Sequence, residues 1–170
     1  EQDCKRFIES TLKTFGRIDI LINNAGISMR SLFLDADMEV LKKIMDVNFW
    51  GAVYCTRFAL PSLIENKGTV VGISSVAGYR GLPGRSGYSA SKFALQGWME
   101  ALRVEMLDLN VNVMWICPGF TTTGIRSAAL GPDGQSRAES PIDEETMMTA
   151  EECAAISLSA IEKNKRNVIM

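Results

Sequence analysis

Histidine is absent from this sequence, and its absence removes several kinds of active site at once. Without histidine there is no Ser-His-Asp or Cys-His catalysis, no histidine-ligated zinc and no histidine general base. Any acid–base chemistry must therefore come from tyrosine, lysine, aspartate, glutamate or cysteine side chains.

Cysteine is scarce, and its spacing matches no metal or redox motif. The four residues lie far apart, at Cys4, Cys55, Cys117 and Cys153. Because no C-x-x-C pair is present, we expect neither a metal site nor a dithiol redox centre. We interpret the four as buried free thiols of a protein in a reducing compartment, which favours a cytoplasmic location.

Long apolar runs and a strong net charge are also missing. No run approaches the ~20 residues that a membrane helix needs, and no signal peptide is visible, so no membrane segment is expected in this chain. The formal net charge is −2, which gives no reason to expect a nucleic-acid partner. The chain opens with Glu1 rather than methionine, which suggests a fragment or a processed product.

The residues that are present have the composition and periodicity of a globular α/β domain. Apolar residues make up 46% and charged residues 22% of the 170 residues, which predicts one domain over residues 1–170. Apolar runs at 18–23, 69–73 and 111–117 predict buried strands, and the 3.6-residue periodicity between them predicts helices. This alternation favours a parallel sheet covered by helices on both faces.

Individual residues predict where some of these helices and strands begin and end. Gly16 is expected to end the first helix, and a helix from about Asp37 toward Leu60 is expected to bend or break at Pro61. Thr149-x-x-Glu152 predicts a capping box at the start of the last helix. A further strand is expected to start at residue 167. The segment 124–148, which is rich in Gly, Ser and Pro, is interpreted as a mobile surface excursion.

Polar residues follow the predicted strands at the points where the strands end. Asn24 follows the first strand, Ser75 follows the second, and Pro118-Gly119 close the third. Ligands of parallel α/β sheets bind at the carboxyl ends of the strands. These residues are therefore predicted to lie along one ligand-binding rim.

Tyr88 and Lys92 form the sharpest feature of the chain. At positions i and i+4 of a helix their side chains share a face. A phenol with an unperturbed pKa near ~10 is a poor acid–base group at neutral pH, and a nearby ammonium lowers that pKa toward the working range. The pair is thus a candidate proton-transfer centre, with Ser75 as a hydroxyl donor beside it.

Each of these residues also has a structural interpretation. Tyr88 and Lys92 could be an exposed pair on a helix surface, and both Ser75 and Asn24 could be ordinary turn residues. Asn48 is a poor helix former within an apolar helix. If Asn48 is buried there it needs hydrogen-bond partners, which suggests a function.

Taken together and in order, these residues resemble the short-chain dehydrogenase/reductase family over about residues 5–123, and more loosely to the end. Asn23-Asn24-Ala25-Gly26 is similar to the family's N-N-A-G motif, and Asn48 in "DVNFWG" to its catalytic asparagine. Ser75, Tyr88 and Lys92 match the catalytic serine and the Y-x-x-x-K motif, with Ser75 thirteen residues before Tyr88. Pro118-Gly119, Thr121 and Thr123 resemble the P-G motif at the nicotinamide.

The resemblance implies a doubly wound Rossmann-like fold and an oxidoreductase that uses NAD or NADP, with a slight preference for NADP. Tyr88 would exchange a proton with the substrate oxygen, and Ser75 would hydrogen-bond that oxygen. Lys92 would bind the nicotinamide ribose and lower the pKa of Tyr88, and Asn48 would hold a water that links Lys92 to solvent. Cofactor-binding residues would be Asn24, Ala25, Gly26, Tyr88, Lys92, Pro118, Gly119, Thr121 and Thr123. A homo-oligomer through helices at about 38–64 and 88–109 is also implied.

The family's first three strands and its phosphate-binding T-G-x-x-x-G-x-G turn have no counterpart in these residues. We therefore expect the chain to be part of a longer enzyme and, by itself, to bind NAD(P) poorly. The strand at 18–23 would then be an exposed apolar edge, prone to pair with another chain.

Two other functional interpretations remain beside the enzyme. The first is a remnant that lacks the cofactor and acts as a binding or assembly module. The second is an unrelated flavodoxin-like domain, which explains none of the motifs. For the enzyme, the Met and Ile content of 124–148 fits a small apolar carbonyl or alcohol substrate, and the stretch 140–170 has a diffuse similarity to the steroid- and retinoid-reducing branch.

Overall fold

The structure, a computed structural model, describes residues 1–136 and 147–170. These residues form a sheet of four parallel strands in the order β1-β2-β3-β4, as predicted from the alternation of helices and strands. The strands are β1 (Ile20–Asn23), β2 (Thr69–Ile73), β3 (Asn112–Cys117) and β4 (Asn167–Ile169). The helices are α1 (Gln2–Phe15), α2 (Met38–Met45), α3 (Gly51–Asn66), α4 (Ser86–Glu105) and α5 (Ala150–Glu162).

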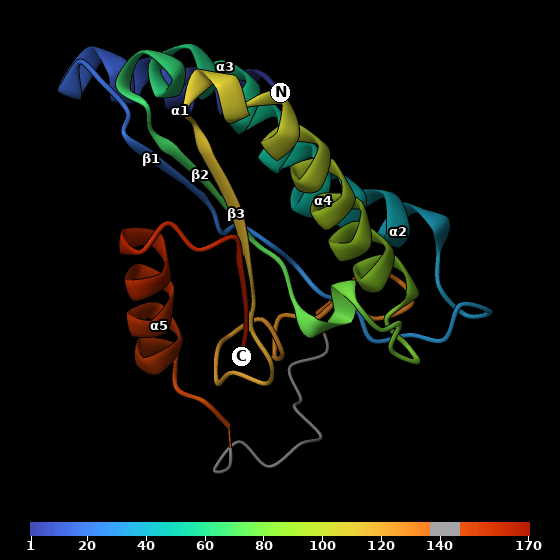
Figure 1. Cartoon of the computed structure of the whole chain (residues 1–170). Coiled ribbons are helices and arrows are strands. Elements are labelled where there is room, and N and C mark those ends of the chain that lie inside the picture. Colours follow the sequence, from blue (N-terminus) through green and yellow to red (C-terminus); the bar gives the residue numbers. More distant parts are fainter. Residues whose placement is uncertain (137–146) are drawn as a thin grey trace.

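Helices cover both faces of the sheet, which makes three layers (Figure 1). α1, α3 and α4 lie on one face, and α5 lies on the other. The alternation of side chains along a strand separates the two cores. Val70 and Val113 belong to the core with α1, α3 and α4, whereas their chain neighbours Val71 and Met114 pack with Ile161 of α5. The predicted double-sided coverage is therefore confirmed.

The helix predicted to bend or break at Pro61 continues through it. α3 runs on to Asn66 with Pro61 inside it, so the alternative of a break is wrong. Pro61 lacks a backbone N–H, but the helical turn that follows it is held by tertiary contacts. Leu63 is fully buried in the core, and Ser62 Oγ accepts a 2.9 Å hydrogen bond from the backbone N of Ile18.

The other local boundaries agree with the sequence. α1 ends at Gly16, and Thr149 and Glu152 form the predicted capping box at the start of α5. The first part of the segment 124–148 packs against the domain: Ala129 and Leu130 are buried, and Leu130 forms a parallel bridge with Met29. The remainder of the predicted excursion, residues 137–146, lies outside the described residues.

Met99 of α4 packs directly against the backbone of β2. Gly72 lies in the middle of the sheet, and a Cβ atom at that position would collide with Met99 Sδ and lie 3.1 Å from Met99 Cε. Met99 is fully buried. The thioether therefore occupies the space that a side chain would take, and α4 can approach the sheet closely.

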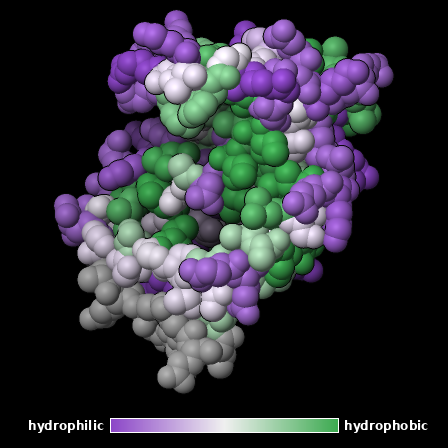
Figure 2. Space-filling view, turned by 90° about the vertical axis from the view of Figure 1, so that its left-hand side faces the viewer, coloured by the Kyte–Doolittle hydropathy of each residue, from purple (hydrophilic) through white to green (hydrophobic). Residues whose placement is uncertain are grey.

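β1 is the edge of the described sheet and is only partly covered. Leu21 is buried, but Ile20 and Ile22 are 50% and 46% exposed. Figure 2 shows apolar surface gathered across the middle of this side of the molecule, on which β1 and α5 both lie in Figure 1. Ile156 and Leu158 of α5 are also exposed. The prediction of an apolar edge is confirmed, and its pairing with another chain stays a prediction.

The cysteines are unpaired in the structure, but only Cys117 is buried, while the other three are half-buried. The expectation of four buried thiols is thus wrong for Cys4, Cys55 and Cys153. Their helices, α1, α3 and α5, each have one face toward solvent, so their side chains are only partly covered. Among the described residues, no helix is long and apolar enough to cross a membrane.

Candidate active site

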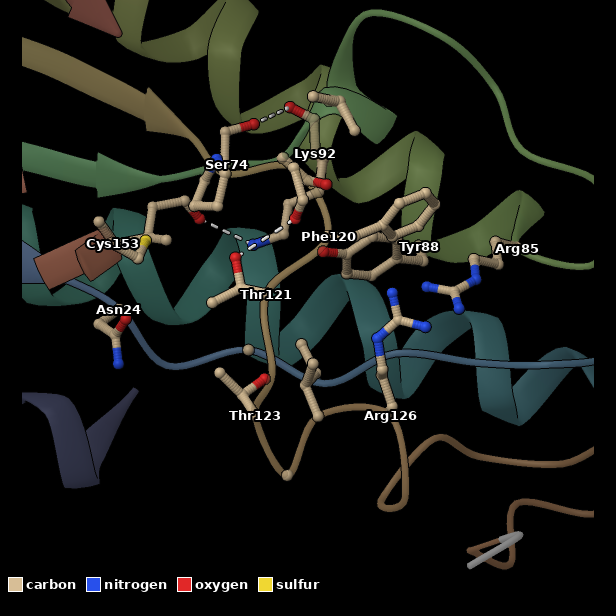
Figure 3. Close-up of a pocket in the computed structure, with 18 of the residues that line it drawn as sticks. Asn24, Ser74, Arg85, Tyr88, Lys92, Phe120, Thr121, Thr123, Arg126 and Cys153 are labelled. Atoms are coloured by element: carbon tan, nitrogen blue, oxygen red, sulfur yellow. Dashed lines mark hydrogen bonds between the residues drawn. The ribbon is translucent and has the colours of Figure 1, made fainter. Parts of the chain in front are cut away.

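A cavity of about 540 Å³ opens at the carboxyl ends of β1, β2 and β3. Its walls come from the turn after β1, the segment after β2, the first turns of α4 and the loop after β3 (Figure 3). Parallel strands bring these four segments to one rim, as the sequence predicted. The residues predicted from the sequence that line it are Asn24, Ala25, Gly26, Ser75, Tyr88, Lys92, Pro118, Gly119, Thr121 and Thr123.

Tyr88 lies in the first turn of α4, is 7% exposed and presents its ring to the cavity. Burial raises the pKa of Tyr88 above its ordinary value, because the phenolate would lose its hydration. A hydrogen bond with Ser75 and the positive charge of Arg85 oppose this rise in the pKa. At neutral pH the phenol therefore holds its proton.

Lys92 lies one turn further along α4 and is 3% exposed. Its Nζ donates a 2.8 Å hydrogen bond to the carbonyl oxygen of Ile73 and lies 5.6 Å from the centroid of the Tyr88 ring. Burial lowers the pKa of Lys92 to about 8. The expected shared face of Tyr88 and Lys92 is confirmed.

The expected effect of Lys92 on Tyr88 is not found. The pKa of Tyr88 is raised, and its lowering influences are Ser75 and Arg85 rather than Lys92. The physical reason is burial, which acts on both groups and disfavours the charged form of each. The sequence showed the pairing of the two side chains but not how deeply they are enclosed.

The burial of Lys92 predicts that replacing it with methionine stabilises the cofactor-free protein in a pH-dependent way. With a pKa of about 8 in the folded state and 10.5 in the unfolded state, Lys92 is a buried charge below pH 8. Between pH 8 and 10.5 the unfolded state binds more protons, so the stability of the wild-type protein rises with pH. Lys92→Met is expected to be more stable by up to about 3 kcal/mol at pH 7, and this advantage fades toward pH 10.5.

Urea unfolding of both proteins at pH 7, 8, 9 and 10 measures this difference. Lys163→Met removes an exposed lysine and serves as the matched control, which should leave the pH slope of the wild type unchanged. The variant's advantage in unfolding free energy should shrink as the pH rises. If it stays constant or grows, the buried ammonium of Lys92 does not destabilise the wild-type protein.

Asn48 is buried behind the cavity and does not line it. It lies in a π-helical turn, Asp46–Trp50, between α2 and α3, and such turns are common at functional sites. Its Oδ1 accepts from the backbone N of Ile27 at 2.8 Å, and its Nδ2 donates to Ile27 O and Ser91 Oγ, each at 2.9 Å. The predicted need for partners is confirmed, and these partners fix the turn after β1 against α4.

The residues present fit the ribose and nicotinamide end of a dinucleotide. Gly26 leaves open the space in front of Lys92, because a Cβ atom there would lie 3.5 Å from Lys92 Nζ and 3.4 Å from Asn48 Oδ1. An ammonium has three donors, and the backbone of Ile73 accepts from one of them. The others can bind ribose hydroxyls. Asn24 and Thr123 lie on the same side of the cavity in Figure 3 and add amide and hydroxyl groups.

Sequence reasoning missed several residues that line the cavity. Arg85 had a usable signal, since it stands three residues before Tyr88, at the N-terminal end of the predicted helix. Phe120 had none, because the loop after β3 has no periodicity from which burial could be inferred. Arg126 lies in the segment 124–148, which the family resemblance implies to be the substrate loop, but nothing in the sequence singled out this residue within it. The remaining missed residues are Ile73, Ser74, Val76, Leu82, Gly124, Ile125, Ala128 and Cys153. Within residues 1–136 and 147–170 no cluster of side chains could hold a metal ion.

Comparison with known proteins gives one consistent result. The family described as short chain dehydrogenase matches residues 1–131. Dehydrogenase/reductase SDR family member 7B of Mus musculus is 40% identical over 162 residues, which are 94% of this chain and 50% of that protein. The 11-beta-hydroxysteroid dehydrogenase-like 4A of Arabidopsis thaliana is 38% identical over 165 residues, 96% of this chain and 54% of that protein.

The fold has a counterpart among solved structures. A short-chain dehydrogenase from Streptomyces avermitilis superposes with a TM-score of 0.80 and 27% identity, over 98% of this chain and 66% of that one. The present chain spans about half the length of the curated relatives that it matches.

Proposed function

The chain belongs to the short-chain dehydrogenase/reductase family, and on that basis we propose that it carries the catalytic part of an NAD(P)-dependent oxidoreductase that interconverts a carbonyl and an alcohol. One observation supports this above the others. Tyr88, Ser75 and Lys92 come from two separate segments, yet all three line the same cavity, and Lys92 Nζ lies 5.6 Å from the centroid of the Tyr88 ring.

When bound at the rim beside Lys92, reduced nicotinamide would supply the hydride for the carbonyl carbon and would itself be oxidised. Ser75 donates a hydrogen bond to the carbonyl oxygen and stabilises the negative charge that develops there. Tyr88 gives its proton to the same oxygen, which completes the alcohol. Its raised pKa supports this role, because the phenol is protonated at neutral pH.

Lys92 and Asn48 would support this proton transfer. Lys92 binds the nicotinamide ribose, and its pKa of about 8 allows it to return a proton toward Tyr88 near neutral pH. Asn48 is a positioning residue, since its side chain ties the turn after β1 to Ser91 of α4. We also propose that it helps to hold a water on the path from Lys92 to solvent.

NADP is the cofactor that we propose to test first, with NAD as the alternative. The proposed substrate is a small apolar carbonyl compound, which is supported by the apolar lining from Ile73, Val76, Leu82, Phe120 and Ile125. The name of the Arabidopsis relative adds steroids to the compounds to be tried.

Deuterium transfer in the natural full-length protein tests the proposal. With NADPH deuterated at nicotinamide C4 and methyl 4-formylbenzoate as the aldehyde, the product alcohol is expected to carry one deuterium at the carbinol carbon. The same experiment with deuterated NADH compares the two cofactors. A folded protein that consumes neither cofactor, and labels none of the aldehyde or steroid ketones offered, would contradict the proposal.

A binding or assembly module is the second candidate function. Ile20 and Ile22 of β1 are half-exposed in the residues given, and an apolar sheet edge can pair with a strand of the same protein or of another chain. Equilibrium binding of NADPH separates the two candidates: micromolar or tighter binding by the full-length protein supports the enzyme, and its absence supports the module.

We further propose a homo-oligomer formed through α3 and α4 and a reducing, cytoplasmic location. Phe93 and Val104 of α4 are 48% and 66% exposed, and Trp50, next to α3, is 43% exposed, so apolar contact area is available on these helices. Four cysteines without a disulfide fit a reducing compartment. Light scattering of the full-length protein tests the oligomer.

A further inference from the structure

Arg126 is a buried cation in the wall of the cavity. It lies in the loop after β3, and only 5% of it is exposed. Its guanidinium stacks over the ring of Phe120 with 4.9 Å between Cζ and the ring centroid. Its Nη1 is buried and has no hydrogen-bond partner within residues 1–136 and 147–170. A buried donor without a partner lowers the free energy of unfolding, so its presence suggests a function.

Arg85 brings a second guanidinium to the same place. It immediately precedes α4, is half-buried and lines the cavity. Burial lowers the pKa of Arg85, and the positive charges of Arg126 and then Arg30 lower it further. The two guanidinium groups are therefore close enough to repel one another. Figure 3 shows both beside the Tyr88 ring, Arg126 reaching up from its loop and Arg85 from the start of α4.

No acidic side chain balances these charges in the described part of the site. Among the described residues, the cavity lining contains Arg85, Lys92 and Arg126 but neither Asp nor Glu. None of the ion pairs found within residues 1–136 and 147–170 involves Arg85 or Arg126. Like charges that are partly desolvated are destabilising unless an anion joins them. Within residues 1–136 and 147–170, the site therefore presents two neighbouring guanidinium groups and no carboxylate to balance them, which is the chemistry that binds an anion.

We propose that Arg126 and Arg85 bind an anionic group, a carboxylate or a phosphate, carried by the carbonyl substrate. This rests on the proposed oxidoreductase function and narrows its substrate to compounds with a reducible carbonyl and a negative charge. Guanidinium groups bind the oxygens of both anions through paired hydrogen bonds. Because Arg85 is three residues before Tyr88, an anion held there also fixes the carbonyl relative to the Tyr88 hydroxyl. The apolar lining is left for the body of the substrate.

Matched aldehydes test the proposal in the full-length protein with its cofactor. The probes are 4-formylbenzoate, its neutral methyl ester and 4-formylphenyl phosphate, which differ in the group opposite the aldehyde. The ratio of kcat/KM for 4-formylbenzoate over the methyl ester is expected to be about tenfold or more, which corresponds to ~1.4 kcal/mol. The phosphate compound, compared with the carboxylate, tells which of the two anions the arginines prefer.

Arginine variants assign that preference to residues. In Arg126→Gln the carboxylate-to-ester ratio is expected to fall toward one, and Arg126→Lys should keep part of it because the charge remains. Arg57→Gln removes an exposed arginine of α3 and should change nothing. Equal use of ester and carboxylate by the wild-type protein would overturn the proposal. So would a ratio that survives in Arg126→Gln.

Binding of the product analogue separates this proposal from the proposed function. If the protein reduces none of the aldehydes, calorimetric titration with 4-(hydroxymethyl)benzoate still tests the anion site. If that compound binds more tightly than its methyl ester, and Arg126→Gln loses the difference, the anion site is supported and the proposed hydride transfer is rejected.

Thermal unfolding checks that the variant is folded. Arg126→Gln is expected to melt at or above the wild-type temperature, since it removes like-charge repulsion. An unfolded Arg126→Gln leaves Arg126→Lys and Arg85→Gln to carry the test.

Discussion

Tyr88→Phe is expected to lower kcat for carbonyl reduction by about 10³-fold, within the 10²–10⁴-fold range of a positioned proton donor. The substitution removes only the hydroxyl group of Tyr88, which lines the cavity together with Ser75. The ring keeps its place in the wall of the cavity, so the affinity for NADPH should change little. Steady-state rates and NADPH fluorescence titration measure the two effects separately.

Tyr79→Phe is the matched control for Tyr88→Phe. Tyr79 is also near the carboxyl ends of the strands, but its hydroxyl accepts hydrogen bonds from Trp115 Nε1 and Asn167 Nδ2 at 3.2 Å and does not line the cavity. Its loss should leave kcat within a small factor of the wild type. If Tyr88→Phe keeps more than a tenth of the activity, the proton comes from another group and the proposed role of Tyr88 is wrong.

Asn48→Ala is expected to cost about 2–4 kcal/mol of unfolding free energy. The side chain is 2% exposed and satisfies three groups, the N–H and carbonyl of Ile27 and the hydroxyl of Ser91. Its removal leaves buried polar groups unpaired, each at ~1–3 kcal/mol, with partial relaxation. The turn with Gly26, which leaves open the space in front of Lys92, should loosen at the same time. We therefore expect KM for NADPH to rise together with the loss of stability.

Chemical denaturation of the full-length protein measures the effect of Asn48→Ala. Asn112→Ala is the control, because its side-chain amide makes one long, exposed 3.4 Å hydrogen bond to Asn164, and surface contacts of that kind contribute little. Equal destabilisation by the two variants would show that the buried hydrogen bonds of Asn48 are not what stabilises this region.

The parts of the fold that the sequence predicted are those specified by local signals. The apolar run 69–73 became β2, and the capping box of Thr149 and Glu152 starts α5, because each depends on residues next to one another in the chain. Pro61 was misjudged because the packing of Leu63 and the hydrogen bond of Ser62, both tertiary, outweigh the local cost of proline. The π-helical turn at Asn48 likewise depends on the partners of that side chain across the domain.

The candidate site was predictable in position but not in its electrostatics. Strand ends, together with the spacing of Ser75, Tyr88 and Lys92, were enough to bring these residues to one cavity. The directions of the pKa shifts depend on enclosure, which three-dimensional packing determines, so the rise at Tyr88 could not be foreseen. The same holds for Arg126, whose burial against Phe120 follows from the path of an aperiodic loop.

Because Met99 packs over Gly72 in the core, its oxidation would report how often α4 separates from the sheet. Met38 is 54% exposed and meets peroxide in the folded protein, whereas Met99 is fully enclosed and meets it only when α4 separates from the sheet. A sulfoxide is larger and polar, and Met99 Sδ already occupies the position where a Cβ atom on Gly72 would lie. A molecule oxidised at Met99 therefore cannot close again in the same way. Oxidative damage to the core would therefore proceed at the rate at which α4 separates from the sheet. Oxidation of surface methionines would not change that rate.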